Sequence, residues 1–490
     1  MMNSGNTESN NNGTSYTDNT FFINSNNTPQ NLVDDKSNQT KSVHIHGLTG
    51  IVNTTNTCYM NSAIQAFSHN YPLTGYLFNK KEEIFEILKK NARKILKDND
   101  SFKLESKTST VPTELREKIQ NPDYSPKMLS LDETNIVFNH TITAQLIRLL
   151  ENMWARNCVV IPTSFRKVFC EARDKFFYGY EQHDAEEAYS CVLQKMQEEL
   201  AEDKNVKFKT TKASVQDFLQ FKNDITMKIK SVSTMEEKKS LLDSYMQKKK
   251  EMAAESLIIE AFREMKKYYG STYSRVTEIF SGFMHSSTIC PEPTCGYSSN
   301  RFEVFLHLSL PMPPNESTDP FTIDGRLRAM SNTTEPVTIE NCMHEFCKEE
   351  ILDEKNLWLC EGCNQKVRGI KKIQLWTAPP VLVIQLKRFN NARTQKDGRF
   401  VSYPMEHFDI SSMISPVQSD TIKCNKYKLI CVINHSGQLN NGHYYTYCLD
   451  ADTDKWFEFN DINVNEISPS VVKTSTAYLL FYIREDFINQ

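Results

Sequence analysis

The sequence lacks any apolar run of about 18 residues, the length that a membrane-spanning helix needs. It also lacks a clear excess of one charge: 57 basic and 61 acidic residues give a formal net charge of −4. A chain this close to neutral offers no broad electrostatic surface for nucleic acid or for an anionic membrane. Both absences predict a protein with no nucleic-acid partner and no membrane partner.

The N-terminus lacks the apolar core of a secretory signal, because its first 20 residues are mostly Asn, Thr, Ser and Gly. An even set of closely spaced cysteines is also missing, since the 13 cysteines are spread along 490 residues. We therefore expect an intracellular protein of the cytosol, the nucleus or both, whose thiols are free or bound to metal.

Most of the chain has the composition of a globular protein, with 39% hydrophobic and 24% charged residues. Residues 1–41 differ, because they are polar, of low complexity and repeatedly Asn. Such a segment cannot bury enough apolar surface to offset the entropy of ordering it. We expect a disordered Asn/Thr/Ser-rich tail at 1–41 and a globular part at 42–490.

Helical spacing dominates the first half of the globular part. Recurring apolar residues predict helices at 82–96, at 143–154 and at 163–192, the last one split near residues 178–181. The charged stretch 80–133 is broken by three prolines, so we expect one helix there, followed by irregular chain.

Residues 200–268 are rich in Lys and Glu and keep a helical pattern, which we interpret as a helical insertion. Within it, Thr234 and Glu237 are spaced as a capping box that opens a helix. A solvated pair of helices packed on the domain is the favoured interpretation. An arm that binds a partner is the alternative.

Strand patterns take over after Ile279. The segment FEVFLHLSLPM alternates with a period of two, and VLVIQLKRF is the nearly continuous β-branched run of a buried strand. Four short strand patterns follow in the last 70 or so residues. A helical first half and a β-rich second half predict an α+β architecture with a cleft between the halves.

One cysteine stands at the start of a helical pattern. In GLTGIVNTTNTCYMNSAIQAF, Cys58 follows turn-forming residues, and Met60, Ile64 and Phe67 recur at near-helical spacing. Unpaired N–H groups at a helix N-terminus carry a partial positive charge that favours the thiolate, which is the nucleophilic form. Cys58 is therefore a candidate nucleophile, and a small buried hydrophobic residue is the alternative interpretation.

Two pairs of cysteines are spaced like metal ligands: Cys290 and Cys295 in CPEPTC, and Cys360 and Cys363 in CEGC. A short spacing lets one turn supply two thiolates, and zinc takes four such ligands tetrahedrally. We expect one structural zinc site here, and reduced thiols in two loops are the alternative. Since four protein ligands leave no open position, we assign the metal no catalytic role.

A third pair, Cys342 and Cys347, has the same four-residue spacer as the first. It lies in IENCMHEFCKEEIL, an amphipathic helical pattern in which Cys342 and Phe346 share a face. Packing in the core is the better interpretation of this pair.

A cysteine nucleophile needs a base, usually histidine, and a group that orients the imidazole. The segment VINHSGQLNNGHYYTY holds two of the 11 histidines, His435 and His443, around a loop in which Gly442 permits a close backbone approach. Seventeen residues beyond His443, KWFEFND ends with Asn460 and Asp461. A side-chain oxygen there could accept from the imidazole N–H and set its tautomer. On these residues alone, His443 is one candidate base among several.

Taken together, these segments resemble the ubiquitin-specific proteases. GLTGIVNTTNTCYMNSAIQAF resembles the family's cysteine box, EQHDAEEAYSCVL its second box, and NHSGQLNNGHYYTYC its histidine box. The segments with the four zinc-spaced cysteines, and KKIQLWTAPPVLVIQLKRF, KWFEFNDINV and AYLLFY after them, are similar to the family in content and order. The resemblance extends over about residues 44–485.

The resemblance implies an α+β, papain-like cysteine protease fold with a helical thumb, a β-rich palm and zinc-bearing β fingers. The thumb would carry Cys58, and the palm would carry His443 and Asn460. The fingers, at about residues 275–375, would grip a ubiquitin body so that its tail reaches Cys58. The catalytic domain would then be residues 42–490.

The activity implied is that of a thiol-dependent deubiquitinase, which hydrolyses the isopeptide bond after the C-terminal glycine of ubiquitin through a thioester. Cys58 matches the nucleophile, His443 the general base and Asn460 the third triad position. Asp461 matches a second acidic position near the site. Asn53 matches the amide of the oxyanion hole, an interaction worth about 2.7–4 kcal/mol in a comparable hole.

Gln182 and Asp184 match positions that hold the ubiquitin tail, which carries arginines, and a carboxylate is the natural partner of a guanidinium. His435 matches a histidine that lines the narrow tail channel, and Gly442, beside the base, is also expected to bind the substrate. A slot that admits only Gly-Gly would explain specificity by exclusion. Ubiquitin and ubiquitinated proteins are thus the implied partners, and we expect a monomer.

Thr55 departs from the family pattern, which usually has glycine at this position. If the position needs a positive φ, threonine would strain the oxyanion loop by about 1–3 kcal/mol. This departure keeps open a fold that grips ubiquitin without cleaving it, and a protease for another ubiquitin-like modifier is a further alternative. The first zinc pair is also spaced more widely than the common two-residue gap.

Overall fold

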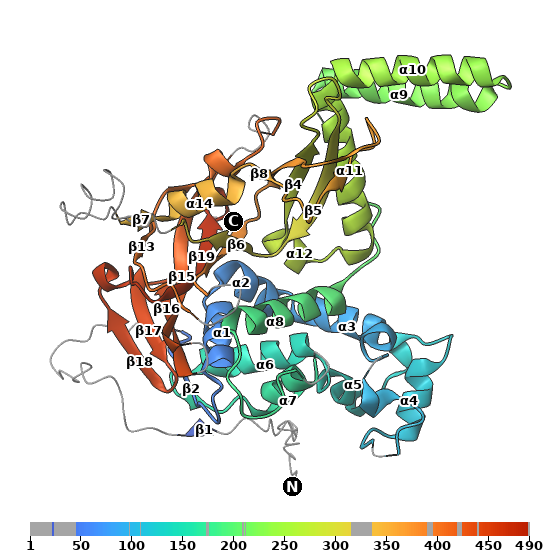
Figure 1. Ribbon diagram of the computed structural model, residues 1–490. Helices are drawn as coiled ribbons and strands as arrows, with labels where there is room; N and C mark the ends of the chain where they lie inside the picture. Colours follow the sequence, from blue (N-terminus) through green and yellow to red (C-terminus); the bar gives the residue numbers. More distant parts are fainter. Residues whose placement is uncertain are drawn as a thin grey trace, which may run out of the picture.

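In the computed structural model, helices are the main regular structure up to about residue 280 and strands the main regular structure after it (Figure 1). The structure describes residues 22–23, 46–97, 99–107, 109–172, 176–207, 210, 212–314, 336–389, 395–418, 424–438 and 441–488. The predicted tail at 1–41 lies outside these ranges except for β1 (Phe22–Ile23), which pairs with β3 (Val159–Val160). That tail therefore stays a prediction.

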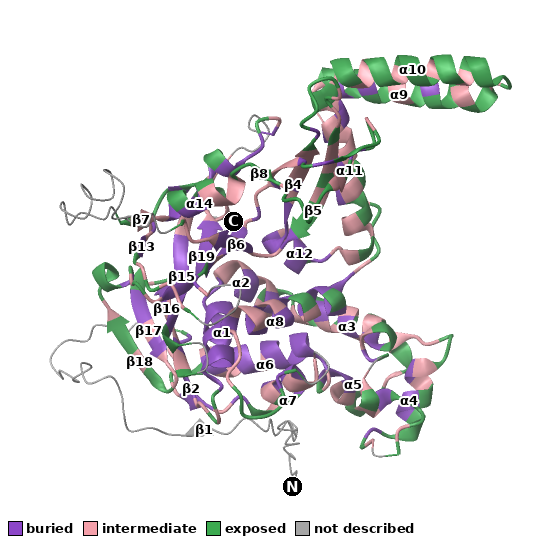
Figure 2. Ribbon diagram, viewed as in Figure 1, coloured by how far each residue is buried: buried purple, intermediate pink, exposed green. Residues whose placement is uncertain are grey.

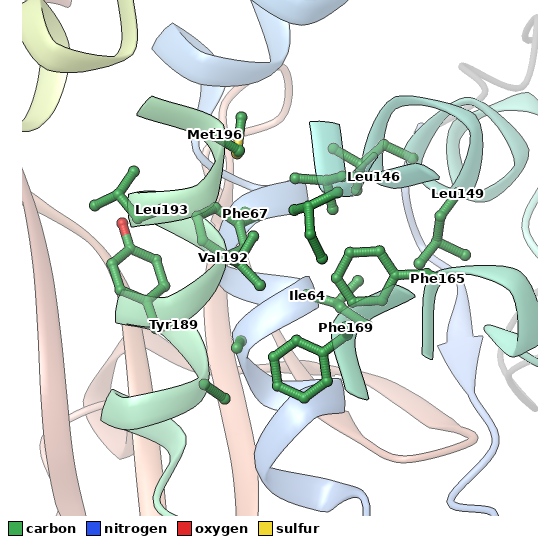
Figure 3. Close-up of a cluster of buried hydrophobic side chains, with 14 of the residues drawn as sticks. Ile64, Phe67, Leu146, Leu149, Phe165, Phe169, Tyr189, Val192, Leu193 and Met196 are labelled. Carbon is green, nitrogen blue, oxygen red and sulfur yellow. The ribbon is translucent and has the colours of Figure 1, made fainter. Parts of the chain in front are cut away.

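Helix α1 (Cys58–Ser68) runs through the centre of the helical part, and every one of its residues is buried. It packs against α8 (Ala185–Leu200) on one side and against three strands of the main sheet on the other, β15 (Lys426–Gln438), β16 (Asn441–Asp450) and β17 (Lys455–Asn460). Figure 3 shows Ile64 and Phe67 of α1 within a cluster of apolar side chains from α6 (Ile142–Ala155), α7 (Thr163–Glu171) and α8. The dense packing fixes the position of the first residue of α1, Cys58.

The predicted helices at 82–96, 143–154 and 163–192 correspond to α3 (Lys81–Ile95), to α6, and to α7 with α8. The expectation of irregular chain after the first of these was wrong, because α4 (Thr113–Gln120) and α5 (Leu131–Phe138) lie there. Pro112 precedes the first turn of α4, where a proline is tolerated, and a capping box of Ser130 and Glu133 opens α5. The other helices of this part are α2 (Tyr71–Asn79) and α12 (Arg275–Phe280).

The main sheet has the strand order β18-β17-β16-β15-β19-β12-β6, with β14 paired to β15. Neighbouring strands are antiparallel except β12 and β6. The strands are β6 (Leu308–Pro311), β12 (Val381–Lys387), β14 (Phe408–Asp409), β15 (Lys426–Gln438), β16 (Asn441–Asp450), β17 (Lys455–Asn460), β18 (Asn463–Ile467) and β19 (Ala477–Arg484).

Both faces of this sheet are covered, which explains the continuous apolar run of β12. Val381 and Val383 belong to the core shared with the helical part, whereas Leu382 and Ile384 belong to the core around α14 (Ile339–Cys347). Successive side chains of a strand point to opposite faces, so a strand covered on both sides needs apolar residues at every position. Figure 2 shows this burial along the central strands and α1. Cys342 of α14 is fully buried in the second core.

A second sheet, with the order β5-β4-β11-β8, forms the finger region. Its strands are β4 (Gly282–Ile289), β5 (Ser298–Phe305), β8 (Glu350–Ile351) and β11 (Ile370–Thr377), and a short hairpin of β9 (Trp358–Leu359) and β10 (Lys366–Val367) accompanies them. Two further short pairs join β2 (Gly50–Ile51) to β3 and β7 (Val337–Thr338) to β13 (Val401–Ser402).

The 200–268 segment contains α9 (Ala213–Ser231), α10 (Met235–Glu251) and most of α11 (Ala253–Thr272). Thr234 caps α10 as expected, since its side chain accepts from the N–H of Glu237. Helix α11 lies along β5, whereas α9 and α10 form a hairpin that extends beyond the finger strands (Figure 1). No residue of α10 is buried. The far part of the insertion is therefore an arm rather than a layer packed on the domain.

The predicted α+β class, with a helical thumb, a β-rich palm and β fingers, is confirmed. Among the helices of the described residues, none is both long and apolar enough to cross a bilayer.

Candidate active site

Cys58 is the first residue of α1 and is 3% exposed. The turn before it is held by Asn53, whose Oδ1 accepts from the Thr57 N–H at 2.9 Å. Cys58 thus lies at the N-terminus of a helix, as predicted from the sequence, where the first N–H groups have no partner within the helix. Cys58 therefore lies at the positive end of the dipole of α1.

His443 of β16 lies beside Cys58. A hydrogen bond with the Cys58 sulfur is the largest of the causes that together raise the pKa of His443 to about 9, with Asn460 and Asp461 acting in the same direction. Its Nε2 lies 2.8 Å from Oδ1 of Asn460, the last residue of β17. This leaves the other ring nitrogen for the sulfur. The three residues predicted as a triad therefore lie in one hydrogen-bonded row.

Asp461 links the helix, the turn and the strand that carry the triad. Its Oδ2 accepts from Nδ2 of Asn53 at 3.1 Å and lies 3.9 Å from Nε2 of His443. Its Oδ1 accepts from Nδ2 of Asn61 in α1 at 3.0 Å. One carboxylate thus fixes the side chain of Asn53, the predicted oxyanion amide, and α1 relative to His443.

The backbone around Asp461 is equally constrained. Asp461 has φ of 51°, and its carbonyl accepts from the Ile51 N–H at 2.8 Å. A Cβ on Gly50 would collide with the carbonyl oxygen of Ile462. Only glycine allows β2 to approach the 461–462 turn this closely.

Asn53 is held at both ends of its side-chain amide, by Thr57 and by Asp461. An amide nitrogen carries two N–H groups, so one of them stays available to a developing oxyanion. The orientation of the amide is therefore set before a substrate arrives.

The expectation that a positive φ at Thr55 could strain the oxyanion loop was wrong. The positive φ in this loop falls on the next residue, Asn56, at 50°, and asparagine tolerates this conformation far better than threonine. Oγ1 of Thr55 instead accepts from Nη2 of Arg166 at 3.0 Å. The feature that favoured a fold without catalysis is thereby removed.

The four predicted metal ligands form a cluster at the finger end of the molecule. The sulfurs of Cys290, Cys295, Cys360 and Cys363 all lie within 4.8 Å of one another. A Cβ on Gly362 would lie 2.8 Å from the Cys295 sulfur, so the second turn needs glycine. The cluster can hold a metal ion.

Comparisons with known proteins identify the family of the chain. Residues 49–482 match the family model described as ubiquitin carboxyl-terminal hydrolase. A probable ubiquitin carboxyl-terminal hydrolase of Acanthamoeba polyphaga mimivirus is 50% identical over 472 residues, which are 96% of this chain and 97% of that protein. The chain belongs to the ubiquitin carboxyl-terminal hydrolase family. This membership confirms the predicted family and the predicted enzyme class.

For other similar proteins, the match covers a smaller share of their own length. Human ubiquitin carboxyl-terminal hydrolase 2 is 29% identical over 443 residues, and the match covers 89% of this chain but 55% of that protein. A structure of the yeast SAGA DUB module matches with a TM-score of 0.52 at 19% identity, over 92% of this chain and 72% of that one. The same module bound to monoubiquitin matches with a TM-score of 0.52 at 18% identity and the same coverage. At these identities the likeness supports the shared fold.

In this ubiquitin carboxyl-terminal hydrolase, Gln182 bridges the thumb and the palm. Its Nε2 donates to the Gly442 carbonyl at 2.9 Å, and its Oε1 accepts from the Gly442 N–H at 3.1 Å. Two of the four predicted substrate-binding residues are thus bonded to each other, next to His443. This bridge was not expected from the sequence.

Asp184 caps α8, where its Oδ1 accepts from the Glu186 N–H at 2.8 Å. Its Oδ2 accepts from the Tyr478 hydroxyl at 2.6 Å. Burial raises the pKa of Asp184 to about 6 despite these bonds. Asp184 therefore positions the N-terminus of α8 in addition to any contact with a substrate.

His435 is 1% exposed and supports the β15–β16 hairpin from within. A Cβ on residue 442 would collide with Nε2 of His435, so only glycine fits beside this histidine. Burial and the nearby Lys396 and His443 lower the pKa of His435 to about 4, which keeps its ring neutral. His435 is therefore buried inside the hairpin, and its predicted contact with the tail stays a prediction.

Sequence reasoning missed Lys396. Its Nζ donates to the His435 carbonyl at 2.6 Å and to the Gly437 carbonyl at 3.2 Å, and it lies 3.0 Å from Nδ1 of His435. The lysine therefore braces the hairpin that carries His443. It stands in a polar stretch without helical or strand spacing, which gave no signal.

Proposed function

We propose that the chain is a thiol-dependent deubiquitinase that hydrolyses the isopeptide bond after the C-terminal glycine of ubiquitin. The observation that carries this proposal is the hydrogen-bonded row of Cys58, His443 and Asn460 at the N-terminus of a buried helix. Membership of the family, and the ubiquitin and ubiquitin aldehyde bound by SAGA DUB modules of the same fold, support ubiquitin as the partner.

The raised pKa of His443 suits a thiolate–imidazolium pair at neutral pH. The Cys58 thiolate attacks the carbonyl carbon of the ubiquitin terminal glycine. The Asn53 amide donates to the resulting oxyanion, an interaction worth about 2.7–4 kcal/mol in a comparable site. His443 then gives its proton to the departing lysine amine, and a thioester remains on Cys58.

The second half of the reaction uses the same residues in reverse. Neutral His443 takes a proton from water, and the hydroxide attacks the thioester carbonyl. Cys58 departs as the thiolate, ubiquitin leaves with a free carboxylate, and the pair with imidazolium is restored. Asn460 accepts from the ring N–H throughout and holds the other nitrogen toward the sulfur.

The Gln182–Gly442 bridge indicates how a tail could be held. An amide that pairs with both the N–H and the carbonyl of Gly442 can pair in the same way with an extended peptide. We expect the tail to take over these bonds as it enters, with Asp184 facing its arginines.

Zinc is the metal that fits the four-cysteine cluster best, because four thiolates at tetrahedral spacing are its typical structural ligands. Bound there, it would join the turn after β4 to the β9–β10 hairpin and stiffen the fingers. It would supply no chemistry to the reaction.

The test is hydrolysis of purified conjugates in which ubiquitin, or another ubiquitin-like modifier, is joined to a lysine side chain. We expect release of free ubiquitin, no release by Cys58→Ala, and slower release from the other modifiers. Binding of ubiquitin without release would contradict the proposal. If another modifier were released faster than ubiquitin, that modifier would be the preferred substrate.

A further inference from the structure

A cavity of about 440 Å³ lies on the thumb beside the oxyanion loop. Three segments line it: Thr54 of the loop, residues 161–170, which include most of α7, and residues 178–180. None of the steps proposed above uses this cavity.

The cavity is basic. Among the residues that the structure describes, the charged ones that line it are Arg166 and Lys167, and none of the lining residues is a carboxylate. Two aromatic side chains at its edge, Tyr178 and Tyr180, are 55% and 72% exposed. The acidic residues nearest in sequence, Glu171 and Glu181, do not line it. Such a surface favours a short acidic segment that can also stack on aromatic rings.

The wall of the cavity is part of the catalytic loop. Arg166 donates from Nη1 to the Thr54 hydroxyl at 3.2 Å and from Nη2 to the Thr55 hydroxyl at 3.0 Å. On the other side of the loop, Nδ2 of Asn56 donates to the Tyr180 carbonyl at 2.8 Å. The residues that line the cavity are therefore hydrogen-bonded to the loop that connects Asn53 to Cys58.

Residues on both sides of Cys58 in the sequence interact with residues that line the cavity: Thr54 and Thr55 with Arg166, and Tyr59 with Cys170 and Arg166. Tyr59, the residue after Cys58, stacks on Phe177 with ring centroids 6.0 Å apart. The pKa of Tyr59 is raised above its ordinary range by burial first, and charges on Cys170, Arg166 and Cys58 act on it as well. A group bound in the cavity therefore contacts side chains that interact with the residues flanking Cys58.

The ubiquitin tail is a poor occupant, because its arginines would face Arg166 and Lys167. Its expected contacts, Gln182 and Gly442, belong to the bridge with the palm rather than to this cavity. The acceptor protein is the other half of the substrate, and it too must lie next to Cys58. We propose, resting on the proposed function, that this cavity binds acidic side chains of the acceptor that flank the modified lysine.

The experiment uses the full chain and ubiquitin joined to the lysine of a short peptide whose flanking residues are Glu, Gln or Lys. We expect kcat/KM for the Glu peptide to exceed that for the Lys peptide by about two- to fivefold, the range of an exposed charge pair. Because exposed charges are screened, the ratio should fall as salt is raised.

Two variants of the exposed Lys167 connect this ratio to the cavity. Lys167→Gln should bring the ratio close to one, and Lys167→Glu should reverse it. The matched control is Lys230→Glu, the same charge reversal on the exposed face of the distant α9, which should keep the wild-type ratio. Melting curves of all three variants establish that they are folded.

A wild-type ratio near one, or a ratio that survives Lys167→Glu, would overturn this inference and leave the proposed function intact. If no ubiquitin conjugate is cleaved, the proposed function fails, and the inference fails with it.

Discussion

At the scale of single residues, the candidate site is a set of side chains that hold one another in place. Cys58, His443 and Asn460 could be identified from the sequence because each stands in a segment with strong local signals, a helix start or a strand end. Arg166 and Lys396 could not, since their partners are 111 and 39 residues away and their own segments give no signal. Long-range hydrogen bonds become visible only when the fold brings the two segments together.

The contact between His443 and Cys58 can be measured directly. Because the sulfur is the largest cause of the raised pKa, Cys58→Ala should lower the pKa of His443 from about 9 toward its ordinary value of 6.5. NMR titration of the His443 ring in both proteins measures this change. Equal values in the two proteins would show that the ring does not touch the sulfur.

The sign of the pH effect on stability follows from the same shift. The pKa of His443 is higher in the folded chain than in the unfolded chain, so its contribution is complete below about pH 6.5 and is lost as pH rises through about 9. Unfolding experiments at pH 6 and pH 9.5 should therefore show a smaller difference in Cys58→Ala than in the wild type.

Asn460 should act through its side-chain oxygen. A hydrogen bond to a charged group is worth about 1.5–3 kcal/mol, so Asn460→Ala should lower kcat by about 10- to 150-fold with little change in KM. Asn460→Asp keeps the acceptor and should retain most of the activity. Steady-state kinetics on ubiquitin conjugates separate the two cases, and equal losses in both variants would refute an orienting role.

At the scale of elements, the site depends on a few close approaches between segments. The sequence predicted α1, α3, α6 and α8 because their apolar spacing is regular. It did not predict α4 and α5, which are short and begin at a proline or at a capping box inside a charged stretch. It also gave no indication that β2 touches the turn beside Asp461.

The close approach of β2 to the 461–462 turn predicts that alanine is harmful at Gly50, whereas alanine at Gly75, which has free space around it, should not be. Gly50→Ala should lower the melting temperature and kcat, because its Cβ would collide with the Ile462 carbonyl and displace Asp461. Gly75→Ala is the control: nothing lies within 4 Å of a Cβ there, and alanine in a helix is favoured by up to about 1 kcal/mol. Thermal unfolding and kinetics of both variants test the prediction, and equal behaviour would contradict it.

The cysteine cluster predicts one zinc per chain. Elemental analysis of the purified protein should find it, and Cys360→Ser should lose it. Hydrogen exchange in β4 and β9–β10 should rise in that variant, whereas exchange in α1 and β16 should not change. Cys347→Ser, outside the cluster, is the control and should keep the metal. A metal-free wild type that is fully folded would argue against a structural site.

At the scale of the whole molecule, a helical half and a β half meet so that residues almost 400 positions apart share one hydrogen-bonded row. Motif order predicted this meeting, because the cysteine, second and histidine boxes follow the order of the family. Neither the direction of the α9–α10 arm nor the Gln182–Gly442 bridge could be predicted. Both depend on how surfaces far apart in sequence are oriented, which local patterns do not encode.

The most direct test of the account is the identity of the residue that ubiquitin modifies. Ubiquitin bearing a C-terminal electrophile should add once per chain, and tandem mass spectrometry should place the adduct on Cys58. His443→Ala should slow the labelling, and Cys58→Ala should abolish it. An adduct on another cysteine, or no adduct on a chain that still binds ubiquitin, would contradict the assignment of Cys58 as the nucleophile.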